Sequence, residues 1–222
     1  MYGHSAATRI TMSELAHPPT GLFIAIEGGD GAGKSRLQAA LAERLAARAE
    51  IVLTREPGGT GLGEQIRSLV LAQRSLADPL AELLLFEAAR AHLVAAVIRP
   101  AVQRGAIVVC DRFTASSIAY QGFGRGLGRE TVERANDIAT GGTSPDLTLL
   151  LDLPVATGLA RRAGDGATNH FDNETVAFHE RVRAGYRELA GASASWCVID
   201  ATQPFDAVLA AAIAAIGPLL SR

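Results

Sequence analysis

The apolar positions of this 222-residue chain gather in five short runs that contain almost no polar residue. The runs cover residues 22–27, 51–54, 106–111, 147–152 and 196–200. A strand with one solvated face alternates between apolar and polar residues, whereas a strand covered on both faces is apolar throughout. The pattern therefore predicts five strands of a buried, mainly parallel sheet.

Between these runs, apolar residues recur at helical spacing. Leu37, Leu41 and Leu45 are four residues apart and form one stripe within residues 35–49. Further helices are predicted at 78–99, where Pro100 should end the helix, at 174–190 and at 204–216. Strands that alternate with helices indicate βαβ units, so we expect an α/β fold with helices on both faces of the sheet.

Two glycine-rich stretches interrupt this alternation and are predicted to be functional loops. They read EPGGTGLG at residues 56–63 and QGFGRGLG at residues 121–128. Pro57 in the first is expected to follow a cis peptide bond, which would make a sharp turn beneath a ligand. No linker divides the chain, so we expect a single domain over residues 21–222, preceded by a flexible polar extension over residues 1–20.

The composition and charge of the chain argue against several classes of function. The net charge of −2 and the pI of about 6.2 argue against a broad surface for nucleic acid or acidic membranes. No run approaches the ~20 apolar residues of a membrane span, and residues 1–20 lack the apolar core of a signal peptide. Cys110 and Cys197 are interpreted as buried thiols, which predicts a reducing, cytoplasmic location.

The sequence GGDGAGKS at residues 28–35 follows the first predicted strand and opens the first predicted helix. It fits the pattern of a phosphate-binding loop, whose glycines let backbone N–H groups turn toward phosphate oxygens. Lys34 is the only lysine among 21 basic residues, and its compact charge suits the β- and γ-phosphates of ATP. Ser35 would supply an oxygen to Mg²⁺. A glycine-rich turn with an exposed lysine is the alternative. The expected ATP-binding residues of this loop are Gly28, Gly29, Asp30, Gly31, Ala32, Gly33, Lys34, Ser35 and Arg36.

The rest of the chain favours a small kinase over other phosphate-loop proteins. A guanine-reading N-K-x-D motif cannot exist without a second lysine. Arg55, Arg90 and Arg112 lie near predicted strand ends or on a helix, and their guanidinium groups could converge on an acceptor phosphate. Asp111 ends a predicted strand, where a carboxylate could orient Mg²⁺ and its water. The alternatives are solvated surface arginines and a helix N-cap at Asp111.

Five motifs together resemble the bacterial thymidylate kinase family over residues 22–216. They are EGGDGAGKS, TREPGGTGLGE, LLLFEAARAHL, CDRFTASSIAYQGFGRGLG and SPDLTLLLD. The resemblance implies a three-layer P-loop NTPase fold with a mobile lid, and a homodimer. It also implies transfer of the γ-phosphoryl group of ATP to dTMP with Mg²⁺ as cofactor. Lys34, Asp111, Arg112 and Arg161 would then be the catalytic residues, with Ser35 and Asp111 at the metal.

The same resemblance implies roles for the residues around the acceptor nucleotide. Asp30 would meet the 3′-hydroxyl of the sugar, Tyr120 would crowd the 2′ position, and Gln121 would lie close by. Arg55 and Arg112 would hold the phosphate. The base would be read by Phe86, stacked on thymine, by Arg90 beside it, and by Ser116 and Ser117 at its edge. Taken without the resemblance, Phe86 reads as a core residue and Tyr120 as an ordinary half-buried tyrosine.

Residues 161–173 match the flexible lid of that family. Arg161 matches its nucleotide-contacting arginine, and His170 occupies a lid position that is arginine in many relatives. The phosphate loop has Gly31 where other relatives carry a transition-state arginine. One hypothesis is that a protonated His170 substitutes for the missing guanidinium. The other, which we favour, is that Arg161 or Arg162 supplies the guanidinium to the transferred phosphate.

Two other functions remain compatible with these residues. One is kinase activity on another deoxypyrimidine monophosphate, such as dUMP. The other is a nucleotide-binding regulator without catalysis, against which the set of Lys34, Ser35, Asp111 and Arg112 argues.

Overall fold

The strands of the sheet lie where the apolar runs predict them. The computed structural model describes residues 21–71, 78–164, 171 and 174–220. The strands are β1 (Leu22–Gly28), β2 (Ile51–Arg55), β3 (Ile107–Asp111), β4 (Leu147–Asp152) and β5 (Trp196–Asp200). Neighbouring strands all run parallel in the order β2-β3-β1-β4-β5, which confirms the predicted parallel sheet.

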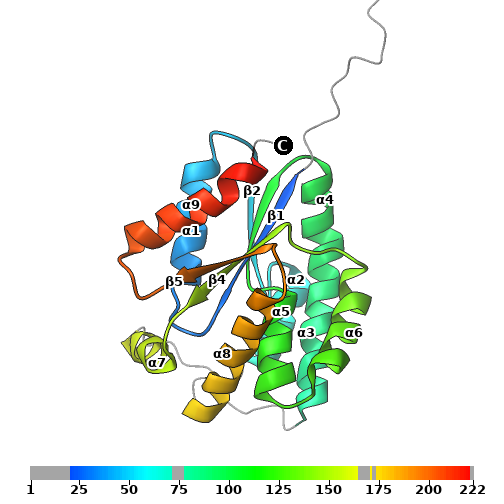
Figure 1. The fold of residues 1–222 in the computed structure, drawn as a ribbon. Helices are drawn as coiled ribbons and strands as arrows, with labels where there is room; N and C mark the ends of the chain where they lie inside the picture. The colour runs from blue at the N-terminus through cyan, green and yellow to red at the C-terminus, as the bar shows by residue number, and fades with distance from the viewer. Residues whose placement is uncertain (1–20, 72–77, 165–170, 172–173, 221–222) are drawn as a thin grey trace, which may run out of the picture.

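Helices cover both faces of this sheet, as Figure 1 shows. One face is packed against α1 (Lys34–Leu45) and α9 (Phe205–Ile216). The other is packed against α3 (Pro79–Leu93), α4 (Arg99–Gln103), the short α5 (Thr114–Ser117) and α8 (Val176–Gly191). Outside these, α2 (Gly61–Val70) and α6 (Arg129–Thr140) pack on α3, and α7 (Val155–Gly164) follows β4. None of the described helices is long and apolar enough to cross a membrane.

Pro100 does not end the helix that precedes it, so this sequence-based prediction is wrong. After α3 the chain passes through a π-helical segment, η2 (Val94–Ile98), and continues directly into α4. The N–H of Arg99 bonds to the carbonyl oxygen of Val94, five residues back, so the hydrogen-bond ladder shifts just before the proline. Pro100 thereby falls in the first turn of α4, where a helix does not need the missing N–H.

The two glycine-rich stretches are only partly loops. Thr60 caps α2 by accepting a hydrogen bond from the N–H of Gly63 at 2.9 Å, so the helix begins inside the first stretch. The second stretch begins in a π-helical segment, η3 (Ile118–Gly124). Helices α2, α5, α6 and α7 were not predicted. The peptide bond before Pro57 is cis, as expected.

Helix α7 approaches the loop after β1 so closely that both contacting residues are glycines. Gly31 has a φ of +73°, and a Cβ there would lie 2.1 Å from the carbonyl oxygen of Gly158. A Cβ on Gly158 would in turn lie 2.5 Å from the carbonyl oxygen of Asp30. Since only backbone stands in the way, neither position can accept a side chain without movement of the loop or the helix. The back of the loop therefore rests on α7.

We expect Gly158→Ala to lower the free energy of unfolding by about 1–3 kcal/mol, because the added methyl group overpacks this contact. Affinity for nucleotide should fall as well, since the loop must shift. Gly191→Ala on α8 is the matched control, because a Cβ there meets no atom within 4 Å. Chemical denaturation and nucleotide titration of both variants make the comparison. Equal behaviour of the two would contradict the role assigned to this contact.

Candidate active site

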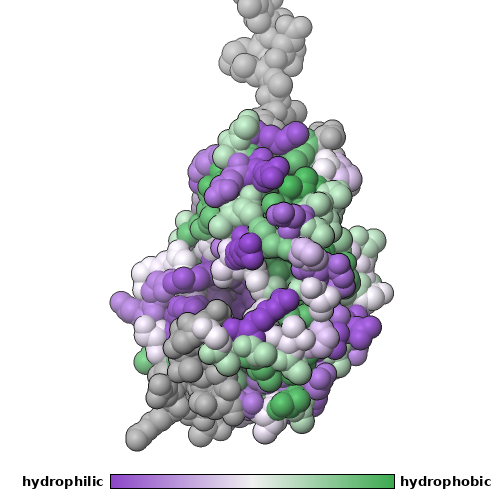
Figure 2. All heavy atoms as spheres, turned by 90° about the vertical axis from the view of Figure 1, so that its left-hand side faces the viewer, coloured by the Kyte–Doolittle hydropathy of each residue, from purple (hydrophilic) through white to green (hydrophobic). Residues whose placement is uncertain are grey.

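A cavity of about 880 Å³ lies at the carboxyl edge of the sheet. Because the strands are parallel, β1, β2 and β3 all end at this edge, which is where α/β sheets bind ligands. Figure 2 shows a hollow with hydrophilic residues around it on the face that carries α7 and α9. The predicted site residues that line the cavity are Asp30, Gly31, Ala32, Gly33, Lys34, Ser35, Arg36, Arg55, Phe86, Arg90, Asp111, Arg112, Ser116, Ser117, Tyr120, Gln121 and Arg161.

The loop between β1 and α1 forms one wall of this cavity. Gly31 and Gly33 both have positive φ angles, of 73° and 88°, which a residue with a Cβ rarely adopts. The loop leads into the N-terminus of α1, where free N–H groups and the helix dipole favour an anion. Lys34 Nζ donates to the carbonyl oxygens of Gly28 at 3.1 Å and Gly29 at 2.9 Å, which holds the ammonium against the loop.

Burial lowers the pKa of Lys34 to about 8. The neighbouring Arg112 contributes to this lowering, while the carboxylates of Asp111, Asp30 and Glu27 act in the opposite direction. An ammonium that is poorly solvated gains more from a phosphate than an exposed one does. The environment of Lys34 therefore favours the binding of a negatively charged ligand.

Ser35 and Asp111 are adjacent, although 76 residues separate them in the chain. The Ser35 hydroxyl donates to Asp111 Oδ2 at 2.7 Å. Within the described part of the chain, no group of three or more His, Cys, Asp or Glu residues could hold a metal on its own. Mg²⁺ in phosphate-transfer sites is held by one or two protein oxygens together with the phosphates. The hydroxyl and carboxylate oxygens of this pair fit that requirement.

Arg112 is held in an unusual backbone conformation directly after β3. Its φ of 72° is the only positive value of a non-glycine residue among the described residues, and its N–H bonds to Ile26 O at 2.9 Å. Its guanidinium donates to Asp30 Oδ1 at 2.7 Å and to the Tyr120 hydroxyl at 3.2 Å. Although burial alone would raise the pKa of Asp30, Arg112 and Lys34 bring it below its ordinary value. Asp30 is therefore an anion that accepts hydrogen bonds.

Two further arginines lie at the cavity. Arg55 is about half exposed and pairs with Glu64 at 3.2 Å. Arg67 on α2 donates from Nη1 to the Pro57 carbonyl oxygen at 2.9 Å and also lines the cavity. Burial, followed by the neighbouring Arg55, lowers the pKa of Arg67. The sequence analysis did not identify Arg67, because no motif distinguishes it from the other arginines.

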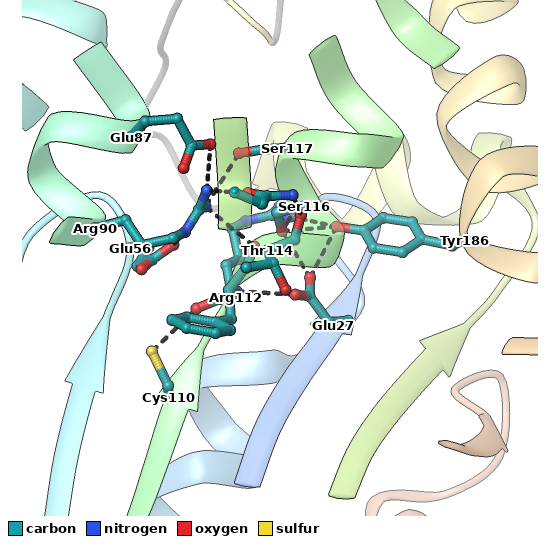
Figure 3. A network of polar contacts seen from close by, with 12 residues as sticks. Glu27, Glu56, Glu87, Arg90, Cys110, Arg112, Thr114, Ser116, Ser117 and Tyr186 are labelled. Atoms are coloured by element: carbon teal, nitrogen blue, oxygen red, sulfur yellow. Dashed lines mark hydrogen bonds and ion pairs between the residues drawn. The ribbon is translucent and has the colours of Figure 1, made fainter. Parts of the chain in front are cut away.

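Arg90 is not available for a phosphate, contrary to the residue-based expectation. Its side chain is 1% exposed. Figure 3 shows it between the carboxylates of Glu56 and Glu87. All five of its N–H groups donate to protein acceptors: Glu56 (2.6 and 2.9 Å), Glu87, Asn136 (2.6 Å), Ser117 (3.0 Å) and the Phe113 carbonyl (3.3 Å). Burial raises the pKa of Glu56 to about 7, although Arg90 opposes the shift.

The other residues predicted to bind the acceptor nucleotide lie around Arg90 and Arg112. Phe86 is half-buried and its ring centroid is 6.4 Å from that of Phe171, which also lines the cavity. Tyr120 donates to Asp30 Oδ2 at 3.0 Å, and Gln121 donates to Glu82 at 2.8 Å. These contacts bring the predicted residues together. Their roles toward a base and a sugar stay predictions.

The expected lid is only partly described. Arg161 and Arg162 lie on α7 and line the cavity, and Arg161 donates to the Ala201 carbonyl oxygen at 3.0 Å. His170 lies outside the described residues. At the same end of the cavity, the guanidinium of Arg36 lies 3.9 Å above the ring of Phe205. Phe205 was missed because it reads as an apolar residue at the start of a helix.

Glu27 and Tyr186 are two further residues near the site that the sequence analysis did not identify. Glu27 is fully buried and accepts hydrogen bonds from Phe113 N, Ser116 and Tyr186. The one sequence signal for it is a charge at the end of the apolar run LFIAI. Tyr186 carries no such signal.

Comparison with known proteins identifies the family. The family model for thymidylate kinase matches residues 26–212. A thymidylate kinase from Thermosynechococcus vestitus is 50% identical over 210 residues, covering 89% of this chain and 87% of the relative. One from Desulfovibrio desulfuricans is 49% identical over 213 residues, covering 90% and 97%. The chain belongs to the thymidylate kinase family.

A solved structure of a family member agrees in fold. The crystal structure of thymidylate kinase from Ehrlichia chaffeensis aligns with a TM-score of 0.69 at 34% sequence identity. The alignment covers 82% of this chain and 93% of that one. The predicted P-loop NTPase fold is thus confirmed, and membership of the thymidylate kinase family makes the chain a nucleoside monophosphate kinase that uses ATP as phosphate donor.

The low pKa of Lys34 predicts a pH limit on ATP capture. The value of kcat/KM for ATP, which reports the free enzyme, should fall as the pH rises through about 8. Above that pH the ammonium loses its proton, so the decline should approach about tenfold per pH unit. The value of kcat should fall only at higher pH, because bound phosphates stabilise the charged form. A flat kcat/KM up to pH 9.5 would contradict this environment for Lys34.

Proposed function

We propose that this thymidylate kinase family member transfers the γ-phosphoryl group of ATP to the 5′-phosphate of dTMP, giving ADP and dTDP. The observation that carries the proposal is that one cavity joins the phosphate loop to the Asp30–Arg112–Tyr120 cluster. Donor and acceptor phosphates can therefore be held facing each other. Positioning of this kind, with charge neutralisation, supplies most of the rate in phosphoryl transfer.

On the donor side, the N–H groups of residues 28–35 and the ammonium of Lys34 would bind the β- and γ-phosphates. Ser35 and Asp111 would hold Mg²⁺, and the bound ion supplies further positive charge to those phosphates. Arg161 would contact the nucleotide from α7. We favour Arg161 or Arg162 over His170 as the source of the transition-state guanidinium, because a neutral imidazole at pH 7 neutralises little charge.

On the acceptor side, Arg55 and Arg112 would hold the phosphate of dTMP. The acceptor is itself an anion, so no strong general base is required. Asp30 would accept a hydrogen bond from the 3′-hydroxyl, and Tyr120, fixed by its bond to Asp30, would block a 2′-hydroxyl. Phe86 would stack on the base, while Arg90 would act beside it through Ser117, to which it donates.

A coupled ADP-release assay across dTMP, dUMP, dCMP and ribothymidine monophosphate tests the function. We expect the highest kcat/KM for dTMP, and Lys34→Ala should lower kcat by at least about 10²-fold while the protein stays folded. Tyr120→Ala should narrow the gap between dTMP and its ribose analogue. Preference for another monophosphate would favour the related kinase activity. No turnover of any of them would favour a regulator.

We also infer that the chain forms a homodimer. Four leucines on the adjacent helices α2 and α3 are 45–60% exposed: Leu62, Leu69, Leu80 and Leu84. Large apolar side chains on neighbouring helices favour contact with a protein surface, and a second copy of the chain would present the same apolar helices in a self-complementary contact. The free thiols of Cys110 and Cys197 support the proposal of a cytoplasmic location.

The double variant Leu69→Glu/Leu84→Glu should shift the dimer toward monomer. Each buried leucine is worth about 1.5–3 kcal/mol, so the dimer dissociation constant should rise at least about tenfold. Sedimentation analysis over a range of concentrations measures it. Val176→Glu, at a 58% exposed position on α8, is the control and should leave the dimer intact. Equal effects of the two changes would place the contact elsewhere.

A further inference from the structure

Glu27 is a fully buried carboxylate next to the active site but not in the cavity lining. Its Oε1 accepts the N–H of Phe113 at 2.8 Å. Its Oε2 accepts the hydroxyls of Ser116 at 2.6 Å and Tyr186 at 3.0 Å. Figure 3 shows Glu27, Ser116 and Tyr186 meeting at this point. Burial raises the pKa of Glu27, against which these hydrogen bonds and Arg112 act. Burying a carboxylate costs free energy, so a function for Glu27 is to be sought in the groups that it contacts.

The carboxylate fixes the direction of the hydrogen bonds around it. The hydrogen bonds that Glu27 accepts and the nearby charge of Arg112 favour its ionised form. An ionised carboxylate can only accept, so each hydroxyl that bonds to it must donate its single proton. Ser116 and Tyr186 are also within 2.8 Å of each other, so one of them can instead donate to the other. In both arrangements the chain of donors ends at Glu27. No hydroxyl proton is left to point anywhere else.

Arg112 lies on the other side of the same two hydroxyls. Its Nη1 is 3.2 Å from Ser116 Oγ and 3.1 Å from the Tyr186 hydroxyl. Because their protons point to Glu27, both oxygens present lone pairs to the guanidinium. Gly28 O accepts from Nη1 as well, at 3.1 Å, while Asp30 and Tyr120 accept from Nη2. Within the described residues, no hydrogen bond uses Nε of Arg112, and that N–H is left for a ligand.

We propose that Glu27 is a positioning residue: it sets the direction of the Ser116 and Tyr186 hydroxyls so that they hold the Arg112 guanidinium in place for the acceptor phosphate. The argument rests on the proposed function of Arg112. Arg112 needs this support because its backbone has a φ of 72°, a strained conformation that persists only where surrounding contacts hold the residue. Glu27 touches no substrate and acts only through the two hydroxyls.

The variant Glu27→Gln tests the proposal with almost no change in shape. Its carbonyl oxygen can still accept from Phe113, but its amide must donate to Ser116 or Tyr186, so a hydroxyl proton turns toward Arg112. We expect the KM for dTMP to rise about 10–100-fold, as for the loss of hydrogen bonds to a charged group. The KM for ATP should stay within about twofold and the melting temperature should not fall, because a buried charge is removed.

Two further variants separate positioning from packing. Tyr186→Phe removes one hydroxyl and keeps the ring, so the KM for dTMP should rise about 3–10-fold. Combined with Glu27→Gln, its effect should be less than additive, because one misdirected proton is gone. Leu189→Ala, at a buried position of α8 away from the cavity, is the control and should lower stability without changing the KM for dTMP.

The outcomes are distinct. A rise in the KM for dTMP in both variants, with the ATP constant unchanged, supports the proposal. Unchanged constants in folded Glu27→Gln, or equal rises for ATP and dTMP, would overturn it. Where Glu27→Gln does not fold, the Tyr186→Phe measurement decides in its place. The wild-type enzyme is assayed in parallel, and failure of wild type to phosphorylate dTMP would count against the proposed function instead.

Discussion

The ion pair between Asp30 and Arg112 is the interaction on which the rest of the site depends. It joins the phosphate loop, which follows β1, to the residue that follows β3, the neighbouring strand. Tyr120 bonds to both members, and Ser116 and Tyr186 bond to the arginine. Since the pair is partly buried, its attraction is screened less than that of a surface pair. The donor and acceptor halves of the cavity are therefore held at a fixed separation.

Buried arginines in this protein are matched by buried carboxylates. Arg90 lies between Glu56 and Glu87, as Figure 3 shows, and its fork-shaped guanidinium satisfies several acceptors at once. Removal of Arg90 would leave both carboxylates without a counter-charge in the interior, which costs more than the pairs contribute. Arg90 thus acts as a rigid support for Ser117 and for the turn at Glu56, and its charge is not available to a phosphate.

The sequence was most informative where one physical requirement excluded the alternatives. Short continuous apolar runs are typical of strands covered on both faces, and the phosphate loop needs its glycines and lysine at fixed spacing, so the strands and the loop could be located. The helices α2 and α7 could not, because the glycines in them have weak helix preference and tertiary contacts decide. Helix α6 is rich in good helix formers but has too few large apolar residues to show a helical stripe. The prediction that Pro100 ends the helix was wrong because a π-helical turn shifts the hydrogen bonds before the proline.

Among the site residues, those to which a motif assigns a chemical role were found. Those that act through partners distant in sequence were not, although Glu27 itself is the first residue of the motif EGGDGAGKS. Glu27 reaches its partners 86, 89 and 159 residues further along the chain, a relation that no local pattern records. Arg67 and Phe205 line the cavity, but most arginines are surface residues and most phenylalanines are core residues, so neither stands out in the sequence. Only the packing of the helices distinguishes them.

The single lysine can now be compared with the arginines around it. Arg112 and Arg90 each form an ion pair with a carboxylate, which consumes much of their charge within the protein. The hydrogen bonds of Lys34, by contrast, go to two main-chain carbonyl oxygens, those of Gly28 and Gly29. Carbonyl groups hold the ammonium in place but do not neutralise it. Carboxylates lie near Lys34, but within the described residues none forms an ion pair with it, so its compact charge is positioned and remains open to a bound phosphate, a task for which a planar guanidinium is less suited.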